Sequence, residues 1–385
     1  MNRIPSDKPP FGLEPKQVKQ LVAFTFDDNA YSGLPGSGGE GGMKFILDLF
    51  AEHKNHDGSP IFGTFFLKGN NIDNNPLEDD SFVKQIWHRA LEEGHELEMH
   101  TYSHPHGLDV DWDDVPAKRV PIMSTEDWMA EHEKCYSVLE KPYDPTKKDS
   151  GIGLERSKIV GFRTPYLEYN DNVFTSVQKL GLKFEAAVEE GWQNDRHGSN
   201  ELWPYTLDNG SPGETFVAED FYASEPLIGK HPGLWALPMY VIIAPPDELC
   251  EKYGTKPGLR DRLAAENQYF DKETGKVTGM DWTAWFEFFM SEDDAFATFA
   301  YTFDLHYEGN RCPYFLGFHT DIYSEKYEKY DLEDADPARL KAHGPERRNF
   351  VRRLLEYILT KPDVQVVTAK QMVEMLSDPE AGLKI

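Results

Sequence analysis

The sequence predicts an α/β fold built on a parallel sheet, because short apolar runs alternate with amphipathic segments along the first half of the chain. Polar residues able to do chemistry follow directly on several of these runs, as is typical of the C-terminal edge of such a sheet. The 385 residues suffice for one large domain with insertions or for two ordinary domains. The pattern fits either an open sheet or one closed into a barrel.

Each apolar run has the length of a buried strand, and each helical segment has an apolar face with cap or stop residues at its ends. Strands are expected at residues 21–28, 61–67, 95–99, 158–162, 183–188, 314–318 and 364–367. Helices are expected at residues 43–53, 80–93, 125–139, 173–180, 347–359 and 369–376.

The regular alternation stops near Trp192, and turn-rich sequence follows to about residue 279. This stretch is predicted to be an insertion with a strand or two, such as 234–243. Two helices come next, and their aromatic stripes at 282–289 and 296–303 are predicted to be core.

The charge balance argues against polyanionic partners. Lys and Arg total 40 and Asp and Glu total 67, so the formal net charge is −27. Such a surface repels nucleic acid and anionic membranes, tolerates a neutral polymer and attracts one that becomes cationic. Solubility or adaptation to salt is the simpler explanation of the charge, and on charge alone it is preferred. The sequence contains no apolar run of 18 residues, so no membrane span is expected.

Three cysteines are present without the spacing of a structural zinc cluster. Residues 1–10 are polar and Pro-rich and lack the apolar region of a secretory signal. Two interpretations remain: an intracellular protein, or a chain that begins after a removed signal.

Two adjacent carboxylates, Asp27 and Asp28, lie where the first strand ends. Adjacent carboxylates repel each other unless a cation or a proton separates their roles. The simpler interpretation is that Asp27 is a surface residue and that Asp28 begins a turn with Asn29.

His100 and His104 follow the third strand and can converge on one ligand. Together with Asp28 they would form a site of two histidines and one carboxylate, which leaves coordination positions open for water and substrate. A divalent cation there would also remove the repulsion within the Asp pair, leaving Asp27 free as a base.

Arg163 and His319 each end another predicted strand. A guanidinium is suited to hold a free carboxylate, and a histidine can donate a proton to a leaving group. A surface arginine and a buried structural histidine are the alternatives. The coincidence of all these polar residues at strand ends favours a functional site.

At this point the sequence resembles the NodB-homology polysaccharide deacetylases, carbohydrate esterase family 4. The resemblance rests on Thr25-Phe26-Asp27-Asp28, His100-Thr101-Tyr102-Ser103-His104, Arg163-Thr164-Pro165-Tyr166 and the late strand ending in His319. The arthropod chitin deacetylases are similar also in a long insertion, with pieces like 202–207, 233–239 and 303–307.

The resemblance implies a deformed (β/α)7-type barrel over residues 21–376 with a loop-rich insertion at about 192–312, an N-terminal extension (1–20) and a C-terminal tail (377–385). It also implies a monomeric, secreted or periplasmic enzyme, with a cytoplasmic location still possible. The implied activity is removal of N-acetyl groups from chitin or chitooligosaccharides with Zn²⁺, or with Co²⁺, Ni²⁺ or Mn²⁺.

The resemblance assigns roles residue by residue. Asp28, His100 and His104 would bind the metal. Asp27 would be the base, held by Arg163, and His319 the acid. The backbone N–H of Tyr166 would bind the oxyanion. The candidate substrate-binding residues are Pro165, Trp192, Leu316, Phe318, Trp203 and Trp235, the tryptophans as sugar-stacking platforms or as core.

The chain departs from the family pattern in two places. Residues 185–192 lack the aspartate expected to tune His319, and Gly317 stands where the family often has leucine. The resemblance also suggests a Cys250–Cys312 disulfide. Other possible functions are deacetylation of xylan or peptidoglycan, hydrolysis of small amides on the same fold, and sugar binding without turnover.

Overall fold

The computed structural model describes residues 3–111, 118–121, 123–212, 228–330 and 337–385. The strands are β1 (Gln20–Asp27), β2 (Thr64–Leu67), β3 (Glu96–Met99), β4 (Leu108–Asp111), β5 (Lys118–Pro121), β6 (Gly161–Phe162), β7 (Phe184–Glu185), β8 (Glu189–Glu190), β9 (Tyr205–Thr206), β10 (Trp235–Ala236), β11 (Met239–Tyr240), β12 (Ile242–Ile243), β13 (Lys276–Val277), β14 (Tyr314–His319) and β15 (Val364–Val366). The helices are α1 (Gly42–Ala51), α2 (Asp80–Glu93), α3 (Thr125–Leu139), α4 (Asp171–Lys179), α6 (Asp247–Cys250), α7 (Leu259–Glu266), α8 (Glu292–Glu308), α9 (Tyr327–Tyr330), α10 (Gly344–Ile358) and α11 (Ala369–Ser377).

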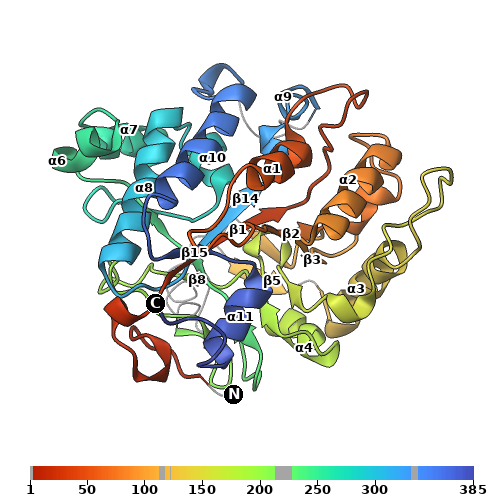
Figure 1. The fold of residues 1–385 in the computed structure, drawn as a ribbon, viewed down its shortest axis with the longest axis horizontal. Helices are drawn as coiled ribbons and strands as arrows, with labels where there is room; N and C mark the ends of the chain where they lie inside the picture. Colours follow the sequence, from red (N-terminus) through yellow and green to blue (C-terminus); the bar gives the residue numbers. More distant parts are fainter. Residues whose placement is uncertain (1–2, 112–117, 122, 213–227, 331–336) are drawn as a thin grey trace.

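Within the described residues, nine strands form one curled sheet in the order β14-β1-β2-β3-β6-β7-β10-β9, with β15 paired to the start of β1. All neighbours on this path run parallel except β10 and β9, which are antiparallel. The helices are arranged around the strands (Figure 1). The predicted α/β fold with a barrel-like sheet and a long insertion before His319 is confirmed.

Strand β1 is buried along its whole length, and β14 pairs with it so that Asp27 lies beside His319. Its side chains alternate between two surroundings, as in any strand. Phe24 and Phe26 pack with Phe318 and the helices, whereas Asp27 points toward the interior of the curled sheet, where Arg163 lies. A strand with both faces buried places the carboxylate in a low-dielectric interior.

The insertion is partly integrated into the barrel. Strands β9 and β10 extend the main sheet, and an isolated parallel bridge joins Met280 to Gly317 of β14. The predicted helix near residues 282–289 is a short π-helical turn, Thr283–Glu287. Trp282 is 39% exposed, so the prediction that it belongs to the core is wrong. Residues 213–227 of the predicted insertion lie outside the described part.

The two ends of the chain pack on the barrel. The Trp203 amide donates to the carbonyl of Ser6, and the Lys19 amide donates to the carbonyl of Leu383. The residues expected to be an extension and a tail therefore form an edge of the same folded unit.

The suggested Cys250–Cys312 disulfide is not formed, because all three cysteines are free and buried. Cys250 and Cys312 lie in different apolar clusters. The thiol of Cys250 donates to the carbonyl of Pro246, and that of Cys312 donates to the carbonyl of Leu202.

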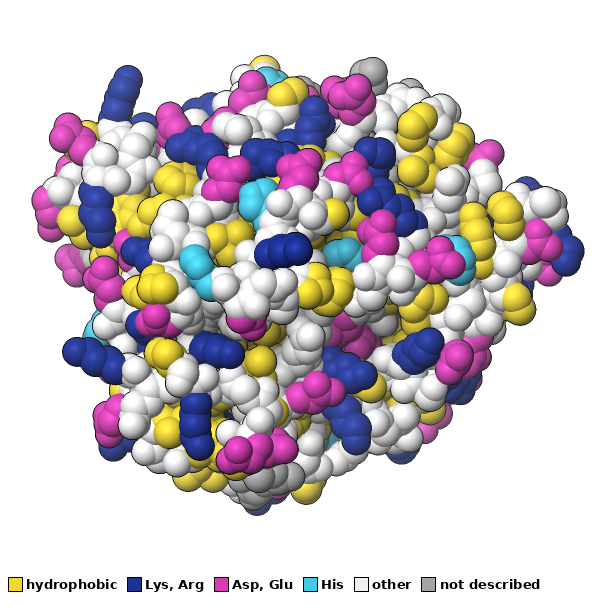
Figure 2. Space-filling view, in the orientation of Figure 1, with side chains coloured by type: hydrophobic (Ala, Val, Ile, Leu, Met, Phe, Trp, Pro, Cys, Tyr) yellow, Lys and Arg dark blue, Asp and Glu magenta, His cyan; other side chains and the backbone are white. Residues whose placement is uncertain are grey.

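Figure 2 shows one face of the molecule, the face with α1, α2 and α10, on which basic and acidic side chains are interspersed. The acidic excess is therefore not concentrated on this face. In the described ranges, no helix combines the length and apolar character needed to cross a bilayer.

Candidate active site

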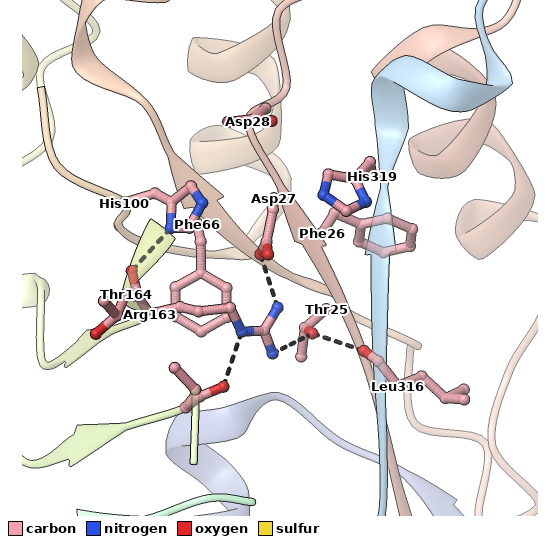
Figure 3. Close-up of polar contacts among 12 residues, drawn as sticks. Thr25, Phe26, Asp27, Asp28, Phe66, His100, Arg163, Thr164, Leu316 and His319 are labelled. Atoms are coloured by element: carbon pink, nitrogen blue, oxygen red, sulfur yellow. Dashed lines mark hydrogen bonds and ion pairs between the residues drawn. The ribbon is translucent and has the colours of Figure 1, made fainter. Parts of the chain in front are cut away.

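The predicted polar residues meet at one edge of the sheet, where neighbouring strands end (Figure 3). Asp27 ends β1 and Asp28 follows it, His100 follows β3, and Arg163 follows β6. His319 is the last residue of β14. Because β14, β1, β2, β3 and β6 are neighbours in this order, the parallel topology alone places these side chains together.

Arg163 is fully buried, and its guanidinium donates hydrogen bonds to three acceptors. It donates to Asp27 Oδ1 at 2.7 Å, to Thr25 Oγ1 at 2.8 Å and to the carbonyl of Ala186 at 2.9 Å. Thr25 in turn donates to the carbonyl of Leu316. Figure 3 shows the Asp27 carboxylate turned toward Arg163 and away from Asp28. A buried charge needs this kind of pairing, and the pair fixes the direction of the Asp27 carboxylate.

The backbone turns sharply after Asp27, which separates the two carboxylates. Asp28 and Asn29 both have a φ of 64°, in the left-handed region that asparagine and aspartate tolerate best. The side-chain amide of Asn29 supports this turn by donating through Nδ2 to the carbonyls of Phe26 and Phe66. Asp28 does begin a turn, as the simpler interpretation held, and the turn delivers it to the histidines.

Asp28, His100 and His104 offer three ligand atoms within 4.8 Å of one another. The Nε2 atoms of the two imidazoles lie 3.1 Å apart, and His104 Nε2 lies 3.6 Å from Asp28 Oδ1. That oxygen is buried and has no hydrogen-bond partner among the described residues. The Nδ1 atom of His100 lies 2.8 Å from the carbonyl of Arg163, to which it donates, so the lone pair of Nε2 points into the cluster.

The ionisation of this cluster suits a divalent cation. Burial lowers the pKa of His100 and lowers that of His104 to about 3, so both rings are neutral at pH 7. Burial alone would raise the pKa of Asp28, but His104, Lys68 and His100 hold it well below its ordinary value. Two neutral imidazoles and one carboxylate, with an unpartnered oxygen aimed at them, fit a site with open coordination positions.

The loop between the two histidines is held by Glu131 of α3. Its Oε2 accepts hydrogen bonds from the amides of Tyr102 and Ser103, at 3.1 and 2.8 Å. Thr101 and His104 have φ values of 64° and 59°, a strained conformation for these residues. Glu131 therefore supports the turn that brings the second imidazole back toward the first.

The partner of His319 is Asp281, which the sequence analysis missed. Asp281 Oδ1 lies 2.8 Å from His319 Nδ1, and Oδ2 accepts from the His319 amide at 3.1 Å. Asp281 comes from the insertion, where the Met280–Gly317 bridge sets it beside β14. Residues 185–192 do not supply this group, since Glu185 bonds to Thr164 instead. No spacing in the sequence indicated Asp281.

Burial would lower the pKa of His319, but the Asp281 carboxylate outweighs that effect and raises it to about 9. Asp27 and Asp28 act in the same direction. His319 is therefore protonated at neutral pH.

Tyr166 is 53% exposed and has a φ of 57°. Its ring lies 4.4 Å from that of His104 and stacks on His106 at 4.0 Å. Pro165 is buried beneath it. The residue predicted to offer its backbone N–H thus lies directly beside the metal-ligand candidates.

Several predicted substrate-binding residues are placed elsewhere. Trp203 is fully buried and Trp235 is 5% exposed, so neither can be a sugar-stacking platform. Leu316 and Phe318 point toward the helices, because they alternate along β14 with Gly317 and His319.

Two methionine side chains occupy the space beside Gly317, the position at which the family often has leucine. A side chain at Gly317 would collide with Met239 and Met280, so these residues fill that space. Of the predicted tryptophans, Trp192 is half-buried. Trp282, which was predicted to be core, is exposed next to Asp281.

Lys68 was not predicted from the sequence either. It follows β2 directly and belongs to the same face as Phe66, whose ring lies 4.4 Å from the Arg163 guanidinium. Its charge contributes to the low pKa of Asp28 and of His104. A positive charge therefore lies near Asp28 and His104.

Comparisons with known proteins agree with this fold. Residues 14–184 match the family model described as polysaccharide deacetylase. Chitin deacetylase 1 of Bombyx mori is 22% identical over 373 residues, 96% of this chain and 53% of that protein, so the chain spans about half the length of this relative. The solved structure of a candidate polysaccharide deacetylase from Mycobacterium smegmatis has a TM-score of 0.53 at 15% identity, covering 98% of this chain and 95% of that one.

Replacing Glu131 by alanine is expected to weaken Zn²⁺ binding about tenfold, because the loop that presents His104 loses its support. Glu131→Gln, which keeps one acceptor, should lose less. Competition with a chromophoric chelator measures the dissociation constant without reference to activity. Glu133→Ala on the same helix, which removes a surface partner of Arg156, is the matched control. Equal affinities of the Glu131→Ala and Glu133→Ala variants would contradict this role.

Proposed function

Because the chain carries a polysaccharide deacetylase domain, we propose that the protein is a metal-dependent N-deacetylase of chitin or chitooligosaccharides. The observation that carries the proposal is that the adjacent carboxylates Asp27 and Asp28 have different partners. Asp28 lies in the cluster with His100 and His104, whereas Asp27 is turned to Arg163. His319 lies beside Asp27 on the neighbouring strand.

The site supports hydrolysis of an amide. Asp28, His100 and His104 would hold a divalent cation, which we expect to be Zn²⁺. When bound, such a cation polarises a carbonyl group and lowers the pKa of an attacking water. Asp27, oriented by Arg163, would accept the proton of that water, and the Tyr166 N–H would donate to the oxyanion that develops.

The amine is a poor leaving group and must be protonated as it departs. His319 is suited to this step, since its raised pKa of about 9 keeps it protonated at neutral pH. Asp281 holds the ring through Nδ1, which leaves the Nε2 proton for the substrate nitrogen.

Three further features support a chitin-like substrate. The Bombyx mori relative is named a chitin deacetylase. Tyr166 and Trp282 expose aromatic surface of the kind that stacks on sugar rings. The product amine is cationic, which suits a chain with a net charge of −27.

We expect the Zn²⁺-loaded protein to release acetate from N-acetylated chitooligosaccharides and to lose this activity when the metal is chelated. Asp27→Asn should reduce kcat about a hundredfold or more, because the base is lost. Asp57→Asn is the control, because Asp57 is exposed and accepts a hydrogen bond from the Ser59 amide within a turn. Acetylated xylan and peptidoglycan tested in parallel define the substrate class. No acetate release by the loaded protein, or equal rates for Asp27→Asn, would refute the proposal.

Asp281→Asn is expected to move the alkaline limb of the kcat/KM profile to lower pH. The carboxylate that contributes most to the raised pKa of His319 is then gone, and burial lowers this pKa against the smaller effects of Asp27 and Asp28. The protonated acid would therefore be lost at a lower pH than in the unmodified protein. Profiles between pH 6 and 10 test this, with Asp261→Asn, an exposed insertion residue, as control. Superimposable profiles would contradict an acid tuned by Asp281.

A further inference from the structure

We propose that Tyr323 is a positioning residue for the acid, holding the Asp281 carboxylate by the oxygen that does not face the His319 ring. This inference rests on the proposed function of His319. The Tyr323 hydroxyl donates to Asp281 Oδ2 at 2.7 Å, while Oδ1 lies 2.8 Å from His319 Nδ1. Asp281 thus accepts three hydrogen bonds, two from His319 and one from Tyr323.

The geometry makes Tyr323 a fixed support. It ends the 3₁₀ turn Thr320–Tyr323 directly after β14, so it and His319 belong to one short segment. Both Tyr323 and Asp281 are fully buried, so bulk water does not reach this hydrogen bond. The segment that carries His319 and Tyr323 therefore donates hydrogen bonds to both oxygens of the Asp281 carboxylate.

The surroundings keep the hydroxyl in its donor form. Burial and the Asp281 carboxylate raise the pKa of Tyr323 well above its usual value. The buried Arg347 guanidinium acts against this rise. Arg347 also donates to the carbonyl of Ile322, the residue before Tyr323, and so fixes the turn.

The support matters because Asp281 does not belong to the core sheet. The backbone of Met280 joins β14 through an isolated bridge and not through a continuous strand, and Trp282 next to Asp281 is exposed. A carboxylate on such a segment can rotate or withdraw unless a second element holds it. Tyr323 restricts the carboxylate to the orientation in which Oδ1 meets the imidazole, and so acts on proton donation through Asp281.

A double-mutant cycle with Tyr323→Phe and Asp281→Asn tests this action. Tyr323→Phe alone should lower kcat about threefold to tenfold with KM unchanged. In the Asp281→Asn background it should cause no further loss, because the group it acts through is gone. Tyr314→Phe is the matched control, since it removes an equally buried tyrosine hydroxyl that donates to the carbonyl of Phe299. Additive losses, or equal effects of Tyr323→Phe and Tyr314→Phe, would overturn the proposal.

A second readout does not depend on activity. The proton on His319 Nδ1, followed by NMR in the protein without substrate, should resonate far downfield and vanish in Asp281→Asn. Tyr323→Phe should shift this resonance, and Tyr314→Phe should leave it in place. An unshifted resonance in Tyr323→Phe overturns the positioning role even if the protein is a deacetylase. A shifted resonance in a protein that releases no acetate leaves the positioning role standing and refutes only the proposed function.

Discussion

The site depends on one buried cation, the guanidinium of Arg163. Because this group has no access to water, it must be paired within the protein, and the partner it selects is Asp27. The carbonyl of the same residue accepts the Nδ1 proton of His100 and so directs the other ring nitrogen into the metal-ligand cluster. One residue thereby orients the proposed base with its side chain and a proposed metal ligand with its backbone. The separation of roles between Asp27 and Asp28 follows from this pairing.

Much of the site could be predicted because parallel topology is a strong constraint. A strand that ends in a polar residue must present it at the same edge as its neighbours, so Asp27, Asp28, His100, Arg163 and His319 converge once the strand ends are located. The fold class was predictable for the same reason. Helices α2 and α3 even begin and end at the predicted residues, because cap residues and the apolar period agree there.

The rest of the site depends on packing between residues that are far apart in the sequence, which a local sequence pattern does not reveal. Asp281 reaches His319 only because Met280 bridges to Gly317, a contact between the insertion and the core. Trp203 and Trp235 were predicted as possible platforms, but aromatic residues contribute so much apolar area that they are buried in a cluster shared by the insertion, the main sheet and the C-terminal segment. Leu316 and Phe318 were predicted to contact the substrate because they are close to His319 in sequence. That prediction did not take into account that side chains alternate between the two faces of a strand.

The central claim is that one divalent ion binds between Asp28, His100 and His104 while Asp27 remains unligated. Anomalous diffraction from crystals of the Zn²⁺-loaded protein tests it most directly. The account predicts a single strong peak bonded to Asp28 and to the Nε2 atoms of both histidines, with Asp27 still paired to Arg163. A peak bonded to Asp27, or no peak at this cluster in protein that contains bound zinc, would contradict it.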